Sequence, residues 1–245
     1  MSVLLETRAI SKRFGGLEAV SGVDFRLERG EVRALIGPNG AGKTTLVGLI
    51  SGRLVPTAGR VLFAGRDITR LPAWHRVGLG IVYTFQLTSI YRRLSVHDNV
   101  ALAAQRRRLR RVTDWLALDR EAVAADVDVA LATVGLGEVH DQPAGALPYG
   151  HQRLLEIAMA LALRPALLIL DEPTQGLAAA ETDAVIGLVR EVARAATVLL
   201  IEHNMAVVLE VADRVTVMDS GHIIAEGTPR QVEAHPDVQR AYLGR

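Results

Sequence analysis

Apolar residues follow three different patterns along the chain. In the first third they form short runs with β-branched residues, bounded by turns of Gly, Asn and Asp, which is typical of strands. Between residues 92 and 136 glycines become few and apolar residues recur at intervals of three and four, as in VDVALATVGL, which indicates helices. The expected early strands cover residues 3–10, 23–29, 32–37 and 60–65.

Strands and helices alternate beyond residue 152. The pattern predicts helices at 154–163, 179–195 and 205–212, and strands at 166–172, 197–203 and 214–221. Such alternation favours parallel strands joined by right-handed crossover helices. Since no internal repeat or low-complexity linker interrupts the order, we expect one α/β unit and not a tandem pair.

Composition removes several classes of protein. The 245 residues are 49% hydrophobic, enough for a substantial core, and 28 Lys+Arg nearly cancel 27 Asp+Glu, so no overall basic field points to nucleic acid. The absence of cysteine excludes disulfides and thiolate chemistry. The opening MSVLLETR is a poor secretory signal, and the longest apolar stretch is interrupted by charges, short of the roughly 20 residues of a membrane span. We therefore expect a soluble chain.

The segment GPNGAGKTT directly follows the apolar run 32–36 and fits G-x-x-x-x-G-K-[ST]. Loop amides and a helix N-terminus together form a nest for phosphates, with Lys43 on the β- and γ-phosphates and the Thr44 hydroxyl on Mg²⁺. Lys43 is one of only two lysines, which agrees with a role that a guanidinium cannot fill. The alternative is an ordinary glycine-rich turn. The predicted nucleotide-binding residues here are Gly37, Pro38, Asn39, Gly40, Ala41, Gly42, Lys43, Thr44 and Thr45.

The run LLILDE, residues 167–172, predicts a buried strand with two carboxylates at its end. Asp171 would hold Mg²⁺, and Glu172 would polarise the attacking water. An apolar strand ending in Asp-Glu is common by itself. Its pairing with the glycine loop makes a phosphate site the better interpretation.

From about Leu4 to Leu243 the chain resembles the ATP-binding cassette (ABC) ATPases, the motor subunits of ABC transporters. The resemblance also rests on YTFQ (83–86), LPYGHQ (147–152), EPTQGL (172–177) and IEH (201–203), in this order. It implies an α/β P-loop NTPase fold with a mainly parallel sheet, an N-terminal antiparallel β part and a helical subdomain. The implied division is an ATPase core of about 1–86 and 153–245, and a helical subdomain of about 87–152.

The same resemblance implies ATP and Mg²⁺ as cofactors, with ATP held between two cassettes. Gln86 would contact Mg²⁺ and the attacking water, His203 the γ-phosphate, and Phe14 the adenine ring. Without the resemblance, Gln86 is a surface polar residue, His203 a loop histidine, and Phe14 a core or turn aromatic. The residues implied to face the partner's ATP, here called the signature turn, are Leu147, Pro148, Tyr149, Gly150 and His151.

Two positions depart from the family's usual residues. Pro148 replaces the serine of Leu-Ser-Gly-Gly-Gln, and Ala178 stands where Asp or Asn commonly follows Gly-Leu. Proline is tolerated in the first turn of a helix, so we expect the fold to survive. A lost hydroxyl–phosphate bond is worth about 1.5–3 kcal/mol if nothing replaces it. A nucleotide-binding module that hydrolyses ATP poorly therefore remains an alternative.

Within the family the chain resembles the ATP-binding subunits of branched-chain amino-acid importers, through FGGLEAVSGVDF, RRLSVHDNV, IEHNM and VQRAYLG. ATPases of lipopolysaccharide export share some of these pieces, and soluble cassettes of DNA repair or ribosomes are a further alternative. The implied partners are transmembrane permease subunits, a second cassette, identical or different, and indirectly a substrate-binding protein, at the cytoplasmic face of the inner membrane. No nucleic acid is expected, because RRRLRR (106–111) lacks interleaved aromatics and favours a solvated or lipid-facing helix.

Overall fold

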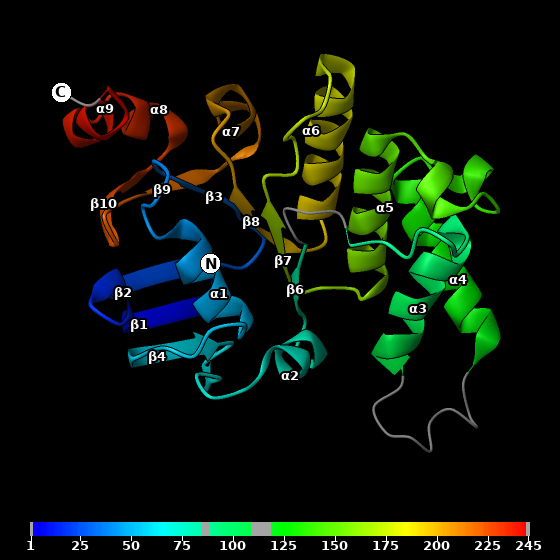
Figure 1. Ribbon diagram of the computed structural model, residues 1–245, viewed down its shortest axis with the longest axis horizontal. Helices are drawn as coiled ribbons and strands as arrows, with labels where there is room; N and C mark the ends of the chain where they lie inside the picture. The colour runs from blue at the N-terminus through cyan, green and yellow to red at the C-terminus, as the bar shows by residue number, and fades with distance from the viewer. Residues whose placement is uncertain (1, 85–88, 109–118, 244–245) are drawn as a thin grey trace.

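The computed structural model describes residues 2–84, 89–108 and 119–243, which form two sheets and a set of helices (Figure 1). The strands are β1 (Val3–Phe14), β2 (Leu17–Glu28), β3 (Val32–Ile36), β4 (Ala58–Phe63), β5 (Arg66–Asp67), β6 (Ile81–Tyr83), β7 (Leu167–Asp171), β8 (Thr197–Ile201), β9 (Arg214–Asp219) and β10 (His222–Gly227). The helices are α1 (Lys43–Ser51), α2 (Ala73–Gly78), α3 (Val96–Arg108), α4 (Arg120–Thr133), α5 (Tyr149–Ala162), α6 (Ala179–Ala193), α7 (Met205–Val211), α8 (Pro229–Glu233) and α9 (Pro236–Leu243), with short 3₁₀ turns η2 (Gly137–Val139) and η3 (Ala144–Ala146).

The main sheet has the strand order β10-β9-β3-β8-β7-β6, and every neighbouring pair is parallel except β9 with β10. The second sheet, β2-β1-β4-β5, is antiparallel and formed by the N-terminal third of the chain. The predicted α/β class, with a mainly parallel sheet and an N-terminal antiparallel part, is confirmed.

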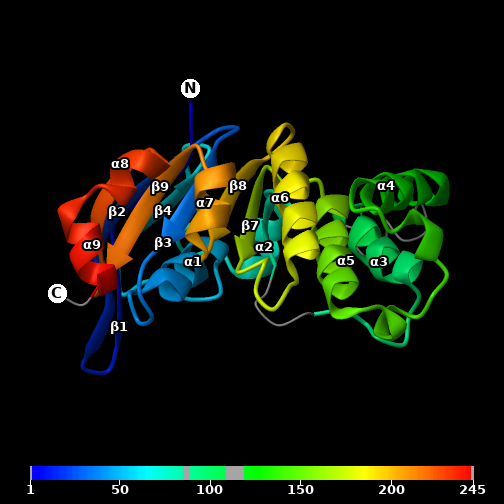
Figure 2. The same cartoon turned by 90° about the horizontal axis from the view of Figure 1, so that it is seen from above.

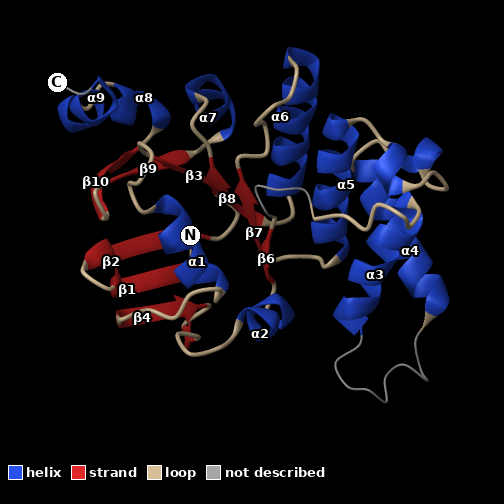
Figure 3. Ribbon diagram, viewed as in Figure 1, coloured by secondary structure: helices blue, strands red, loops and turns tan. Residues whose placement is uncertain are grey.

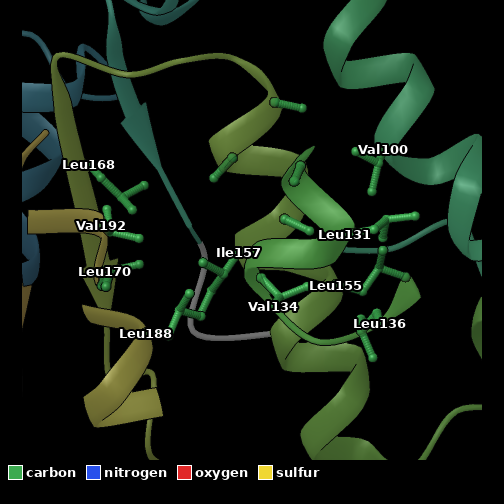
Figure 4. Close-up of a cluster of buried hydrophobic side chains, with 14 of the residues drawn as sticks. Val100, Leu131, Val134, Leu136, Leu155, Ile157, Leu168, Leu170, Leu188 and Val192 are labelled. Carbon is green, nitrogen blue, oxygen red and sulfur yellow. The ribbon is translucent and has the colours of Figure 1, made fainter. Parts of the chain in front are cut away.

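The central strands β3, β7 and β8 are mostly apolar because both faces of the main sheet are covered. In β7, Leu168 and Leu170 point to one face and belong to a buried cluster that also contains side chains of α4, α5 and α6 (Figure 4). Leu167 and Ile169 point to the other face and pack with α1 and the antiparallel sheet. Period-two alternation thus divides one five-residue strand between two cores.

The helices α3, α4 and α5 pack together at one end of the molecule, with α6 between them and the main sheet (Figures 1 and 2). The strands occupy the opposite part of the molecule (Figure 3). Helix α5 crosses residue 152, where the predicted subdomain boundary falls, and that division remains a prediction. Helix α5 also begins at Tyr149, five residues before the helix expected from periodicity.

In the described part of the chain, no helix combines the length and apolar character needed to cross a membrane.

Candidate functional site

The carboxyl ends of the parallel strands gather the candidate residues at one edge of the main sheet. Because β3, β8 and β7 are neighbours, the loop after β3 lies beside the residues that follow the other two strands. These residues are Asp171 at the end of β7, Glu172 after it, and His203 just beyond β8. The position matches that of ligand sites in open α/β sheets.

The loop between β3 and α1 requires glycine at two positions. Gly37 and Gly42 have φ values of 149° and 98°, which side-chain-bearing residues rarely adopt. A Cβ atom at Gly37 would lie 2.1 Å from the Met218 carbonyl oxygen, and one at Gly42 would lie 2.4 Å from that of Ala19. The loop is therefore pressed against surrounding backbone, and its turn into α1 is set by packing.

Lys43 begins α1 and points back into this loop. Its Nζ donates to the carbonyl oxygens of Gly37, at 2.6 Å, and Pro38, at 3.0 Å. Burial lowers the pKa of Lys43, while the nearby carboxylates of Glu172 and Asp171 act in the opposite direction. The ammonium thus lies against the loop and close enough to the two acids to interact with them, and Thr44 is exposed next to it in sequence.

Asp171 is buried and hydrogen-bonded to a tyrosine that the sequence did not single out. The Tyr83 hydroxyl donates to Asp171 Oδ2 at 2.5 Å, and the Arg53 guanidinium carbon lies 5.1 Å from the centre of the Tyr83 ring. Burial raises the pKa of Asp171, and the Tyr83 hydrogen bond partly offsets this effect. Burial and the Asp171 contact also raise the pKa of Tyr83. Tyr83 is therefore a neutral donor that orients the Asp171 carboxylate.

Glu172 has a left-handed backbone, with φ of 47°, which is uncommon for a residue other than glycine. Its N–H donates to Ile201 O at 2.9 Å, and Arg153 Nη2 donates to the carbonyl oxygens of Asp171 and Glu172 at 2.8 and 3.1 Å. The buried Arg153 also pairs with Glu156 at 2.8 Å. These contacts hold the strained turn in place.

His203 Nδ1 lies 3.9 Å from Glu172 Oε1, so the two predicted catalytic side chains face each other across the ends of β7 and β8. The His203 side chain is exposed and the Glu172 side chain is mostly covered. A carboxylate and an imidazole at this separation can act together on one water molecule or phosphate.

The signature turn, residues 147–151, leads into α5 and presents Pro148, Tyr149 and His151 to solvent. Pro148 is the N-cap of α5, with an extended backbone at φ −53° and ψ 154°. The buried Gln152 side chain donates to Leu147 O at 2.7 Å and so stabilises the turn. Its proline is therefore compatible with the helix start, as expected from the sequence.

The structure does not bring all predicted residues together. Along the long axis of the molecule, α6 lies between α1 and α5 (Figures 1 and 2). The signature turn at the start of α5 is therefore separate from the chain's own glycine loop. Phe14, at the end of β1, has 45% of its surface exposed, with Lys12 Nζ 5.0 Å from the centre of its ring. Gln86 lies outside the described residues.

The residue types at the sheet edge fit a magnesium ion that is shared with a nucleotide. Magnesium usually keeps several waters and takes one or two protein ligands plus phosphate oxygens. Asp171 and Thr44 would provide that small oxygen set, and the described residues include no cluster of three or more His, Cys, Asp or Glu that would hold an ion by itself.

Comparison with known proteins agrees with this geometry. The family model described as "ABC transporter" matches residues 20–175, and that of "Branched-chain amino acid ATP-binding cassette transporter" matches residues 222–245. The chain is 40% identical over 253 residues to the high-affinity branched-chain amino acid transport ATP-binding protein BraF of Pseudomonas aeruginosa, with 98% of each chain covered. It is 39% identical over 256 residues to LivG, of the same description, from Escherichia coli strain K12, again with 98% of each covered.

Solved structures show the same likeness across the whole chain. The ADP conformation of MJ1267, an ATP-binding cassette of an ABC transporter, superposes with a TM-score of 0.89 at 31% identity, covering 100% of both chains. A nucleotide-free ATP-binding cassette superposes with a TM-score of 0.88 at 32% identity, also covering 100% of both. The family model spans well over half of the chain and the relatives span nearly all of it, so the resemblance inferred from the motifs is confirmed and the chain belongs to the ABC transporter family.

Proposed function

We propose that this chain binds and hydrolyses ATP to power an ABC importer, and that the importer carries branched-chain or related amino acids. The observation that most directly supports hydrolysis is the sheet edge, where Glu172 Oε1 lies 3.9 Å from His203 Nδ1 and both Glu172 and Asp171 interact with Lys43. Import is supported by BraF and LivG, whose descriptions name branched-chain amino acid transport, and by the match of residues 222–245. These similarities favour import over lipopolysaccharide export.

In the proposed reaction, the amides of the glycine loop and Lys43 bind the phosphates of ATP. Glu172 accepts a proton from the attacking water, and His203, 3.9 Å from it, contacts the γ-phosphate. Thr44 and Asp171 would hold Mg²⁺, which neutralises the charge on the phosphates when bound. Phe14 is proposed to stack on the adenine, for which an exposed ring is suited.

We also propose that ATP lies between two cassettes, with the signature turn of one facing the nucleotide of the other. The exposure of Pro148, Tyr149 and His151, and their separation from the chain's own loop, support this arrangement. The second cassette is another copy or a different one, and permease subunits and a substrate-binding protein complete the transporter at the cytoplasmic face of the membrane. Residues 1–86 and 153–245 would be the ATPase core, and 87–152 the helical subdomain.

Replacing Glu172 by glutamine tests this function. Loss of the general base should lower the rate of ATP hydrolysis by at least about a hundredfold while ATP binding persists. Uptake of leucine by cells that carry only this variant should be lost with it. The control is Glu210→Gln, on the exposed surface of α7, which should leave both activities unchanged.

The outcomes separate the parts of the proposal. Normal hydrolysis by Glu172→Gln would refute the assignment of Glu172 as the general base. Intact leucine uptake in cells that lack the whole chain would refute the amino-acid importer function. A defect in lipopolysaccharide export in those cells would support the export alternative.

A further inference from the structure

Glu202 is a buried carboxylate between the end of β8 and His203, and neither the motifs nor the proposed reaction assigns it a role. Only 1% of its surface is exposed. Its Oε1 accepts hydrogen bonds from the backbone N–H of Thr174, at 3.2 Å, and from the Thr174 hydroxyl, at 2.5 Å. Its Oε2 accepts from the backbone N–H groups of His203, at 3.1 Å, and Asn204, at 3.4 Å. Four neutral donors thus converge on one charged side chain.

The two oxygens of Glu202 hold two different segments of the active edge. Oε1 binds the turn that follows Glu172, and Oε2 binds the backbone of His203 at the start of the next turn. The side chains of Glu172 and His203 come from these same segments and lie 3.9 Å apart. The Glu202 carboxylate therefore links, through hydrogen bonds, the two segments that carry the side chains used in the proposed reaction.

We propose that Glu202 is a positioning residue for ATP hydrolysis, which sets the placement of His203 relative to Glu172. This inference rests on the proposed ATPase function. An ionised carboxylate only accepts hydrogen bonds, so both of its oxygens match the donors around them. Charge-assisted bonds of this kind are roughly twice as strong as neutral ones, which favours one fixed arrangement of the two segments.

The isosteric change Glu202→Gln tests this link, because the new NH₂ group must face donors on one side or the other and release that segment. In single-turnover assays of the full chain, alone or assembled with its permease, we expect a fall of about ten- to a hundredfold in the hydrolysis rate. The dissociation constant for ATP should change little, because the glycine loop and Lys43 are untouched.

A second background separates positioning of His203 from general weakening of the fold. If Glu202 acts through His203, then Glu202→Gln should slow a His203→Ala variant by less than about twofold further. An equal loss in both backgrounds, or a rate close to wild type for Glu202→Gln alone, would overturn the inference. The exposed variant Glu210→Gln is the matched control and should remain as active as wild type.

Changes at Thr174 keep the inference testable if Glu202→Gln does not fold. Thr174→Ser preserves the hydroxyl bonded to Glu202 and should retain activity, whereas Thr174→Val removes it and should lower the rate without changing ATP affinity. Equal rates for the two variants would contradict the link. Failure of wild type to hydrolyse ATP, or normal hydrolysis by Glu172→Gln, would instead refute the proposed function itself.

Discussion

Asp171 and Lys43, at the edge of the main sheet, are ionisable residues that are at least partly buried. Burial raises the pKa of Asp171 and lowers that of Lys43, so it disfavours the charged form of each. Their mutual attraction and the Tyr83 hydrogen bond act against burial. A site that keeps both charges before nucleotide binds is suited to phosphate and a divalent cation, and it lowers the stability of the free protein.

The raised pKa of Asp171 leads to a prediction for Asp171→Asn. The folded chain binds the Asp171 proton more tightly than the unfolded chain, so ionisation above the ordinary aspartate range opposes folding. Without nucleotide, the asparagine variant should therefore have the higher thermal midpoint at pH 7. The difference should vanish below about pH 3, where aspartate is protonated in both states. Thermal unfolding across this pH range measures it, and a variant less stable than wild type at pH 7 would contradict the prediction.

At the scale of elements, hydrophobic periodicity predicted most of the strands and the apolar part of the helix after the signature turn, but not the first turn of that helix. The strands β3, β7 and β8 are short, mostly apolar runs, so composition and length identify them. Helix α5 starts earlier than the periodic segment 154–163 because Tyr149, Gly150 and His151 do not share its apolar pattern. Periodicity alone therefore does not identify the first turn of the helix, which follows the N-cap Pro148.

The residues of the candidate site were likewise predicted only in part from the sequence. Lys43, Asp171 and Glu172 were predicted because each belongs to a motif with fixed local spacing, and the structure places them at one edge, although their roles remain predictions. Tyr83 and Glu202 were not predicted, although both lie inside quoted motifs. Their hydrogen bonds reach 88 and 28 residues along the chain, and no local pattern encodes such pairs.

Two glycine substitutions test how the elements meet. Gly187 lies inside α6, and a Cβ added there would meet no atom within 4 Å, so Gly187→Ala should raise the free energy of unfolding by about 0.5–1 kcal/mol. A Cβ at Gly150 would lie 2.1 Å from Glu181 Oε1, and displacing Glu181 would release the Ala178 N–H that its Oε2 accepts at 2.9 Å. Gly150→Ala should therefore destabilise by about 1 kcal/mol, the usual cost of a lost helix cap. Denaturant unfolding of the two variants measures both changes in free energy. Stabilisation by Gly150→Ala would show that the contact of Glu181 with the Ala178 N–H does not depend on the space left by Gly150.

The whole molecule is elongated, with the glycine loop and the signature turn on elements separated along its long axis (Figure 2). In the proposed dimer, the residues that depart from the family's usual pattern would affect the partner's nucleotide and leave the chain's own loop intact. Pro148 and Ala178 are both exposed, and the signature turn packs against the segment that contains Ala178 through Gly150 and Glu181. If the second cassette has a serine in its signature turn, the two ATP sites are unequal.

Restoring the serine by Pro148→Ser tests this inequality. The new hydroxyl can donate to the partner's phosphate, and one such charge-assisted bond corresponds to a rise of about ten- to a hundredfold in turnover at the affected site. Stability should change by less than about 1 kcal/mol, because serine is a favoured N-cap and the backbone of Pro148 is already extended. Steady-state ATPase of the assembled transporter gives the measurement. Pro229→Ser, at the start of α8 at the other end of the molecule, is the control and should leave turnover unchanged. If Pro148→Ser folds normally and turnover does not rise, the amides at the start of α5 already suffice for the partner's phosphate, and the proline leaves the two sites equal.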